Sequence, residues 1–316
     1  MNFSAAQVNL VPNPSFEEYI TCPDNISHLN YAIPWFSPSG GTSDYYNVCD
    51  NSGNVGVPTN AIGYQYAHTG VAYSGIVYAS NEVGVDTCCF EYISVKLSEI
   101  LKKHKKYNLQ FFVSIADSLN GIHMTRSTGS AIAPIGCLFT SDIPNWSGRL
   151  LSPKNVCAES DSTILLIDSL GWQQINMSCV GKGDEQYLTI GFFRTYKKIK
   201  YSYLSTDGAV DAYYYIDDVS LIEDGYNYPE KLSSIFTPNS DGINDVFYID
   251  TSLAEKISVQ VYNRWGNLVF ESLNKTMWDG NNNNGKPYTE GVYYYLVSFI
   301  NKEEQKDYKG FIQLVR

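Results

Sequence analysis

The chain has 316 residues with 33 acidic and 22 basic side chains, so its formal net charge at pH 7 is −11. This length allows two domains that each bury a core, and the acidic balance disfavours nucleic acid and anionic lipid as partners. Charged residues make up only 17% of the chain and aromatic residues 14%, which favours strand-rich globular domains over disorder.

The start of the chain, residues 1–7, is too short for a secretory signal peptide, yet Ser4, Ala5 and Ala6 resemble the small residues that precede a cleavage site. We therefore expect these residues to be a signal-peptide remnant or an artificial start. No apolar run approaches the roughly 18 to 20 residues that a membrane-spanning helix needs, so no direct membrane span is predicted.

Residues 8–222 are expected to form one β-sandwich domain. Residues 20–70 are rich in Gly, Pro, Asn and Ser, which predicts a long loop region that its aromatic residues hold in place. Elsewhere the alternation of apolar and polar residues predicts strands, at residues 72–78, 90–97, 107–116, 133–139, 171–179, 186–194 and 213–222. Only residues 95–106 show helical spacing, so a short helix or turn is predicted there.

Residues 223–232 are polar, contain Gly225 and Pro229, and follow the last apolar strand, so they are expected to be a linker. Residues 233–316 then hold short predicted strands at close intervals, at residues 234–236, 246–249, 257–263, 268–271, 292–300 and 308–315. This density of strands is typical of an immunoglobulin-like sandwich. The predicted fold class is therefore all-β, with a large N-terminal sandwich and a small C-terminal one.

All cysteines of the chain lie before residue 180, at Cys22, Cys49, Cys88, Cys89, Cys137, Cys157 and Cys179. Neither these cysteines nor the scattered histidines have the spacing of a zinc site, so disulfides in an exported protein are expected. Cys22 and Cys49 flank the long aromatic loop, and a disulfide between them would offset the entropy of ordering it. We predict this disulfide and leave the pairing of the other cysteines open.

The sequence shows no catalytic constellation, because it lacks a Gly-x-Ser-x-Gly nucleophile motif, a phosphate-binding loop and a dinucleotide fingerprint. Asp217 and Asp218 are neighbours on a predicted strand, so their side chains point to opposite faces and cannot form one acid/base pair. The chain is therefore predicted not to be an enzyme, and catalytic groups on separate strands are the alternative.

Aromatic side chains of the long loop are candidates for a ligand platform, because aromatic rings stack on the apolar C–H faces of sugars. The same side chains could instead anchor the loop to the sandwich, which is the favoured interpretation for most of them. The candidates are Trp35, Phe36, Tyr45, Tyr46, Tyr64 and Tyr66.

The two ends of the N-terminal domain, residues 11–17 and 215–221, resemble the first and last strands of galactose-binding-like jelly rolls, the fold of many carbohydrate-binding modules. Further segments resemble the N-terminal cargo domain of exported Bacteroidetes surface proteins, at residues 41–49, 56–60, 63–66 and 171–174. The resemblance implies a jelly-roll β-sandwich. It also implies a structural calcium ion held by Glu17 and one of Asp217 and Asp218, whose carboxylate oxygens suit calcium. Alternatively, these carboxylates cap strand ends or pair with basic residues.

The C-terminal domain carries a series of turn and aromatic residues in a definite order. They are Pro238, Asn239, Asp241, Gly242, Asn244, Asp245, Tyr262, Asn263, Arg264, Trp265, Gly266, Trp278, Asp279, Gly280, Gly285, Gly291, Tyr293, Tyr295, Lys309 and Gly310. In order and spacing, this series resembles the gliding motility-associated C-terminal domain, which is the type B sorting domain of the type 9 secretion system. The oxygens of Asp241, Asn244 and Asp245 could hold calcium or simply cap a tight turn, and the turn is the favoured interpretation.

This second resemblance implies a protein that is exported through the periplasm to the cell surface or the extracellular space. The implied partners are the type 9 translocon pore and a companion outer-membrane barrel of the PorP/SprF type, with a surface glycan for the cargo domain. The cargo domain is expected to be an adhesin or glycan-binding module with a role in gliding motility. The alternative is a secreted enzyme or enzyme subunit, for example a polysaccharide-active one, with a cleft that the sequence does not reveal.

Overall fold

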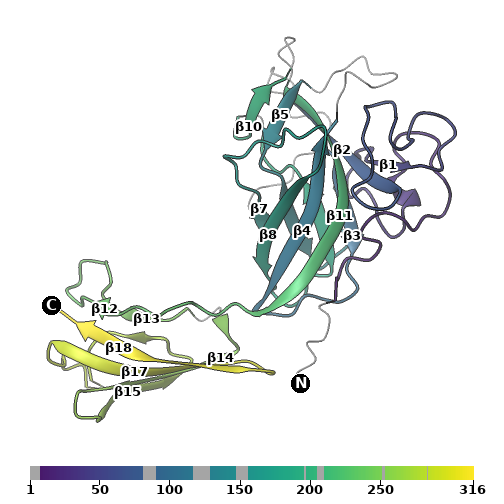
Figure 1. Cartoon of the computed structure of the whole chain (residues 1–316). Coiled ribbons are helices and arrows are strands. Elements are labelled where there is room, and N and C mark those ends of the chain that lie inside the picture. Colours follow the sequence, from purple (N-terminus) through teal and green to yellow (C-terminus); the bar gives the residue numbers. More distant parts are fainter. Residues whose placement is uncertain are drawn as a thin grey trace. The chain divides into compact units, whose positions relative to one another are not determined.

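In the computed structural model the chain divides into two units, Met1–Gly225 and Tyr226–Arg316, and both are built from β-strands (Figure 1). The structure describes residues 8–80, 90–116, 129–146, 156–195, 197–204, 210–250, 253–282 and 284–316. The predicted remnant at residues 1–7 and the cysteines Cys88 and Cys89 lie outside these ranges. The predicted all-β class is confirmed. Within the described ranges, no helix has the length and apolar character needed to cross a membrane.

The first unit contains two larger sheets that share one hydrophobic core. The five-stranded sheet has the order β1 (Asp44–Asn47), β2 (Ala72–Ser80), β11 (Val210–Tyr226), β4 (Lys105–Ile115) and β8 (Gln173–Val180). The four-stranded sheet has the order β3 (Tyr92–Lys96), β9 (Tyr187–Gly191), β6 (Gly136–Thr140) and β7 (Ala158–Glu159). The remaining elements named in this unit are the strand pair β10 (Lys200–Tyr203) and β5 (Ser130–Ala133) and the 3-10 helix η1 (Leu29–Tyr31).

Strands β4 and β8 show why these residues form a sandwich. In β8 the side chains of Ile175, Met177 and Cys179 are buried, and the residues between them are exposed. Because successive side chains of a strand point to opposite faces, one face of β8 enters the core and the other meets solvent. The antiparallel register places the buried Leu109 of β4 opposite Met177, so the apolar faces of both strands coincide. Their polar faces coincide for the same reason.

The region predicted as a long loop, residues 20–70, contains a strand and a disulfide. Strand β1 is buried at every position and pairs with β2 in the five-stranded sheet. The predicted disulfide between Cys22 and Cys49 is present. A second disulfide joins Cys157 to Cys179. The loop region is therefore held to the sandwich by covalent, backbone and side-chain contacts.

Of the short helix or turn predicted at residues 95–106, the helix is absent, and a turn at residues 103–104 precedes β4. Between β3 and β4 the backbone N–H groups of Leu97 and Leu101 donate to carbonyl oxygens of the segment that precedes β9. His104 has a φ of 67°, which is outside the helical region. The helical spacing of Leu97 and Leu101 thus reflects two separate burials against the sandwich, since both side chains are buried.

Three further differences concern strand bounds. The predicted strand at residues 133–139 begins later, as β6, and the preceding β5 ends at Ala133, because Pro134 between them has no N–H to donate to a sheet. Strands β7 and β10 were not predicted, since alternation cannot be recognised over so few residues. Strand β11 continues to Tyr226, so the first part of the predicted linker at residues 223–232 belongs to this strand.

The second unit is built around Trp278. Its five-stranded sheet has the order β12 (Ile235–Phe236), β18 (Gln305–Leu314), β17 (Gly291–Ile300), β14 (Lys256–Tyr262) and β15 (Leu268–Leu273). Its two-stranded sheet pairs β13 (Phe247–Tyr248) with β16 (Met277–Trp278). Trp278 is 1% exposed, and its ring centroid lies 5.3 Å from that of Phe236 and 5.2 Å from that of Tyr293. The buried indole therefore joins the two sheets.

Candidate functional site

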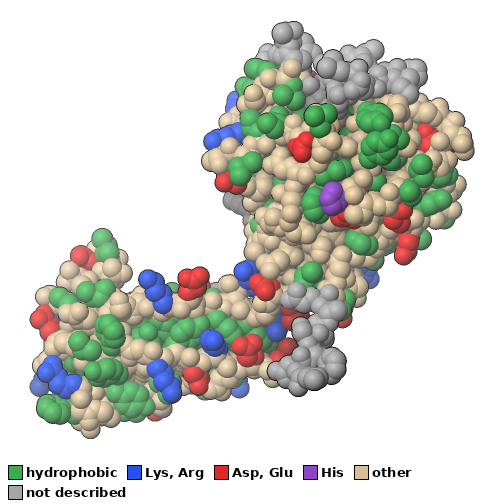
Figure 2. Space-filling model, viewed as in Figure 1, with side chains coloured by type: hydrophobic (Ala, Val, Ile, Leu, Met, Phe, Trp, Pro, Cys, Tyr) green, Lys and Arg blue, Asp and Glu red, His purple; other side chains and the backbone are tan. Residues whose placement is uncertain are grey.

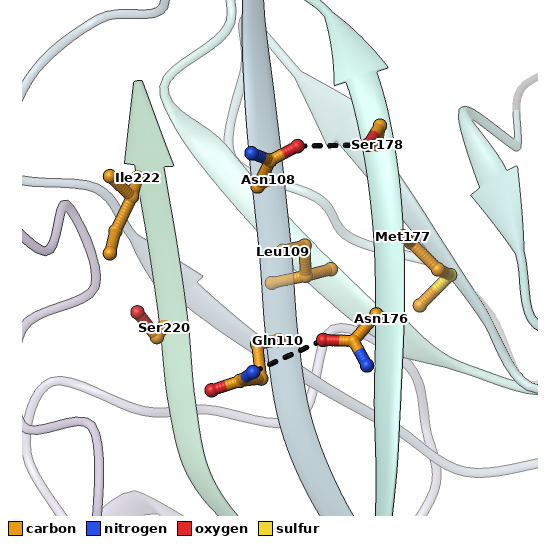
Figure 3. Close-up of a pocket in the computed structure, with 8 residues that line it drawn as sticks. All are labelled: Asn108, Leu109, Gln110, Asn176, Met177, Ser178, Ser220 and Ile222. Atoms are coloured by element: carbon orange, nitrogen blue, oxygen red, sulfur yellow. Dashed lines mark hydrogen bonds between the residues drawn. The ribbon is translucent and has the colours of Figure 1, made fainter. Parts of the chain in front are cut away.

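The outer face of the five-stranded sheet carries a row of polar side chains from β4 and β8, here called the amide row. It consists of Asn108, Gln110, Gln174, Asn176 and Ser178. The Gln110 amide Nε2 donates to Asn176 Oδ1 at 3.1 Å (Figure 3). Gln174 Nε2 donates to the same oxygen at 3.1 Å. The Ser178 hydroxyl donates to Asn108 Oδ1 at 2.9 Å. These hydrogen bonds hold the polar side chains in a defined arrangement.

Four members of the amide row, Asn108, Gln110, Asn176 and Ser178, line an open cavity of about 430 Å³. The cavity extends across β11 through Ser220 and Ile222 and is also lined by Leu109 and Met177 (Figure 3). None of its lining residues is charged. The face of the first unit visible in Figure 2 is likewise covered mainly by uncharged side chains. The side chains of Leu109 and Met177 are themselves buried in the core. On the outer face the cavity therefore offers amide and hydroxyl groups beside the apolar side chain of Ile222, which suits a neutral ligand rich in hydroxyl groups.

An aromatic cluster continues the amide row along β4. Phe112 lies two positions beyond Gln110, and the imidazole ring of His68 stacks on it with 3.7 Å between centroids. The indole Nε1 of Trp172 donates to the backbone carbonyl of Tyr66 at 3.0 Å, and the indole meets the His68 ring edge-on at 6.1 Å. Tyr66 is 62% exposed. Aromatic rings and amide groups thus lie next to each other on one face.

The predicted aromatic platform is divided by the structure. The side chains of Trp35, Tyr45 and Tyr46 are buried, with at most 2% exposure. The Trp35 indole donates from Nε1 to the Asn13 carbonyl at 2.8 Å, and the Tyr45 hydroxyl donates to the Phe16 carbonyl at 2.9 Å. These three side chains agree with the favoured interpretation as loop anchors, because buried side chains that hold the loop cannot stack on a ligand.

The other aromatic candidates lie nearer the surface. Tyr64 and Tyr66 are 40% and 62% exposed, and their rings meet edge to face at 5.7 Å. Phe36 is half-buried and meets the ring of Tyr187 edge-on at 6.3 Å. Since Tyr66 also contacts Trp172, the exposed pair lies beside the aromatic cluster of the candidate site.

Sequence reasoning missed the amide row. A signal was present, because Asn108 and Gln110 alternate with buried residues on one strand and Gln174 and Asn176 do so on another. A merely solvated face shows the same alternation, so the pattern alone does not indicate a site. Only the register of two strands brings together Gln110 and Asn176, which are 66 residues apart in the chain.

The predicted calcium ligands Glu17, Asp217 and Asp218 all contact the turn at residues 68–72. Glu17 Oε1 accepts backbone N–H groups of this turn at 2.8 and 3.1 Å. Asp217 Oδ2 accepts the backbone N–H of His68 at 2.8 Å, and Asp218 Oδ2 lies 2.5 Å from His68 Nδ1. Two of the three carboxylates therefore cap backbone donors, which was the alternative to calcium binding.

Asp217 is the most enclosed of these carboxyl groups. Its burial, followed by the neighbouring charge of Asp218, raises the pKa of Asp217 to about 8. In the described part of the chain, no three His, Cys, Asp or Glu side chains are grouped so that they could hold a metal ion. A calcium ion at this turn would need backbone carbonyl oxygens as further ligands, and calcium accepts such ligands.

In the second candidate calcium loop, side-chain carboxylates accept hydrogen bonds from the backbone of the loop itself. Asp245 accepts the backbone N–H groups of Asn239, Ser240 and Gly242 at 3.1, 2.7 and 2.8 Å. Asp241 Oδ1 accepts a further backbone N–H at 2.8 Å. These side chains serve as caps of a tight turn, which agrees with the turn interpretation of the sequence.

Other motif residues of the second unit also form its turns and core. Asn263 Oδ1 accepts the N–H groups of Trp265 and Asn267 at 2.9 and 3.0 Å, which closes the hairpin between β14 and β15. A Cβ atom at Gly310 would lie 2.5 Å from the Tyr295 hydroxyl, so this position requires glycine. Trp265, by contrast, is 81% exposed at the tip of the hairpin. Its indole is not needed for the core.

A buried carboxyl group links the loop region to β11. Asp44 is 4% exposed, its Oδ1 accepts the Ser27 N–H at 2.5 Å, and its Oδ2 accepts the Tyr213 hydroxyl. Glu91 is also buried and accepts the N–H and the hydroxyl of Thr42 at 2.8 and 2.6 Å. Burial, followed by the charge of Glu91, raises the pKa of Asp44 to about 7.

The fold defines a two-unit, all-β protein whose first unit carries an open cavity on one sheet face. Residues 230–314 match the CHU_C type IX secretion signal domain. The second unit is thus a secretion signal, and the protein is exported to the cell surface or the extracellular space. No curated protein matches the chain.

Solved structures resemble the chain at low identity. The carbohydrate-binding module TmCBM61, solved with β-1,4-galactotriose, is 14% identical over 69% of this chain and 99% of that one, with a TM-score of 0.31. The K1 cleaved adhesin domain of Lys-gingipain from Porphyromonas gingivalis W83 is 16% identical over 67% and 96%, with a TM-score of 0.30. The N-terminal cellulose-binding domain of Cellulomonas fimi β-1,4-glucanase C is 9% identical over 59% and 90%, with a TM-score of 0.27. Similarities of this size say nothing about a ligand.

The division of the loop aromatics into buried anchors and exposed rings can be tested by measuring the free energy of unfolding of variants. Trp35→Ala should lower the free energy of unfolding by about 3–5 kcal/mol, because it removes a buried indole and its hydrogen bond. Tyr66→Ala should leave the free energy of unfolding nearly unchanged, because most of its side chain is exposed. Chemical denaturation measures both values, and equal losses in the two variants would contradict the division.

The buried Asp44 predicts a pH dependence of stability. Its pKa is raised from 3.8, so the folded chain binds this proton more tightly than the unfolded chain does. Stability should therefore fall as the pH rises from about 4 to about 7. Asp44→Asn cannot ionise and should flatten this slope, whereas the exposed control Asp184→Asn should keep it. Thermal midpoints between pH 4 and 8 test this, and an unchanged slope in Asp44→Asn would show that other groups are responsible.

Proposed function

We propose that the first unit is a glycan-binding module and that it binds sugar on the outer face of the five-stranded sheet. The observation that supports this proposal is the amide row beside the aromatic cluster of His68, Phe112 and Trp172. Sugars present hydroxyl groups and apolar C–H faces, which amide side chains and aromatic rings recognise respectively. The uncharged lining of the cavity favours a neutral glycan.

The amide row is organised before a ligand arrives. Gln110, Gln174 and Asn176 bond to one another, so a sugar would meet fixed donors and acceptors and less side-chain entropy would be lost on binding. The indole N–H of Trp172 is already bonded to the Tyr66 carbonyl. Trp172 would therefore offer its ring to the ligand, while the amides supply the hydrogen bonds.

The same proposal includes the biological setting that the sequence resemblances imply. The module acts as an adhesin at the cell surface and contributes to gliding motility. Its second unit binds the type 9 translocon pore and a companion barrel of the PorP/SprF type during export. The secretion signal match at residues 230–314 and the exposed Trp265 of the motif support this part.

A binding role is preferred to catalysis. In the described ranges, the buried acids Asp44, Glu91 and Asp217 are all bonded within the fold, and the cavity at the amide row has no charged lining residue. The enzyme alternative therefore has no specific observation in its favour.

Substitutions in the amide row test the proposed glycan site. Gln110→Ala and Asn176→Ala should each weaken binding of a retained neutral polysaccharide about tenfold, which corresponds to one lost hydrogen bond of about 1.4 kcal/mol. Affinity electrophoresis through gels with β-galactan, β-glucan or xylan measures the retention, and the thermal midpoint should stay nearly constant. The matched control Gln305→Ala removes an exposed amide of the second unit and should bind like the wild type. Retention by none of these polysaccharides, or equal retention of all variants, would refute this site.

We also propose that Glu17 and Asp217 hold a structural calcium ion together with carbonyl oxygens of the turn at residues 68–72. Glu17 lies near the start of the domain and Asp217 near its end, and both carboxylates contact this turn. Carboxylate oxygens are of the type that calcium prefers. The ion would fasten the N-terminal segment to the last strand.

Calcium addition tests this second part. Millimolar calcium should raise the thermal midpoint of the wild-type protein, because a ligand that binds only the folded state stabilises it, and a chelator should reverse the rise. Asp217→Asn should abolish the effect. Asp241→Asn, in the turn of the second unit, should leave it intact. A calcium effect that survives Asp217→Asn would place the ion elsewhere, and no effect in the wild type would exclude it.

A further inference from the structure

Three cysteine sulfurs of the first unit lie together. Cys157 and Cys179 form a disulfide, and the Sγ atom of the free thiol Cys137 lies 3.7 Å from Cys179 Sγ. Cys137 belongs to β6 of the four-stranded sheet, and its carbonyl accepts the backbone N–H of Cys157 at 2.9 Å. Cys179 belongs to β8 of the other sheet. Either Cys137 or Cys157, on the side of one sheet, can therefore form a disulfide with Cys179 of the opposite sheet.

The three sulfurs differ in their access to solvent. Cys137 and Cys179 are 0% and 4% exposed, whereas Cys157 is an exposed residue. A disulfide between Cys137 and Cys179 would be internal and would leave a thiol at the surface. The present disulfide has the opposite arrangement, with the free thiol inside.

We propose that these cysteines form an exchangeable disulfide and that Cys157 is a surface site of covalent thiol modification. The Cys137 thiolate attacks Cys179 Sγ, a Cys137–Cys179 bond forms, and the Cys157–Cys179 bond breaks. Cys157 leaves as a thiolate and takes up the proton that Cys137 lost. One disulfide replaces another, so the exchange needs neither oxidant nor reductant. The freed Cys157 thiolate then adds to an electrophile, or attacks a small disulfide from solution, forming a mixed disulfide and releasing one small thiol.

Both pairings preserve the fold. Cys137 and Cys157 are both on the side of the four-stranded sheet, so either one connects it covalently to β8. Exchange is slow at neutral pH because burial raises the pKa of Cys137 to about 12. Below that value the thiolate fraction, and with it the exchange rate, rises about tenfold per pH unit.

Labelling of the full chain with N-ethylmaleimide, without reductant and under native conditions, tests the proposal. Peptide mapping should find label on Cys157 together with a Cys137–Cys179 disulfide, and the labelling rate at pH 8 should be about tenfold that at pH 7. Cys137→Ser should abolish label on Cys157. The Cys22–Cys49 disulfide should stay unlabelled throughout and serves as an internal control.

A second variant keeps the test decisive if Cys137→Ser does not fold. Cys157→Ser should still form the Cys137–Cys179 disulfide and keep a thermal midpoint near that of the wild type. Three results would each overturn the proposal. They are no label on Cys157 in the wild type at either pH, label on Cys157 that persists in Cys137→Ser, and free thiols at both Cys137 and Cys179 in Cys157→Ser.

Discussion

The antiparallel pairing of β4 with β8 is the constraint on which both the core and the candidate site depend. The register that places Leu109 opposite Met177 inside the sandwich also places Gln110 opposite Asn176 outside it. A shift of one residue would exchange the two faces of the strand and bury the amides. The apolar core thus determines the position of the polar row, so the free energy that stabilises the fold also arranges the site.

The exposed rings of Tyr64 and Tyr66 beside the candidate site are held in place by hydrogen bonds of a loop residue, not by strand register. Tyr64 and Tyr66 lie in a segment without regular strand structure, but the residue between them, Gln65, is 5% exposed. Its side-chain Nε2 donates to the Ser114 hydroxyl at 2.6 Å, and its backbone carbonyl accepts the Tyr73 hydroxyl at 3.0 Å. One buried polar residue therefore holds two exposed rings next to the sheet. Exposed recognition groups on a loop need such buried partners, because an untethered segment would lose more entropy on binding.

The sequence predicted the strands where a buried face alternates with a more exposed one over several residues, as in β4 and β8. The sequence was misleading at Leu97 and Leu101, whose spacing is helical. Each of these side chains is buried against the sandwich on its own, and the segment that carries them is not a helix. The sequence could not tell loop anchors from exposed rings for a related reason, since Trp35 and Tyr66 are both aromatic in sequence and differ in the contacts that surround them. The amide row could not be predicted, because it exists only through the register of β4 and β8. Residue type indicates what a side chain can do, and tertiary contacts decide whether it is free to do it.

The two units illustrate why a secretion signal is easier to recognise than the function of its cargo. In the motif of the second unit, contacts with neighbouring atoms restrict which residue type fits at many positions. At Gly310 the nearby Tyr295 hydroxyl leaves no room for a Cβ atom, and at position 263 the Asn side chain accepts two backbone N–H groups. Replacing such a residue disturbs the fold, so the motif describes a structure. The cavity of the first unit, in contrast, is lined on its outer face by amides whose bonds are to each other and whose loss leaves the core intact. Trp265 belongs to this second class although it stands within the motif, because its indole is exposed and its backbone alone closes the hairpin. In both units, the side chains that the fold does not require are therefore the ones through which a partner can be recognised.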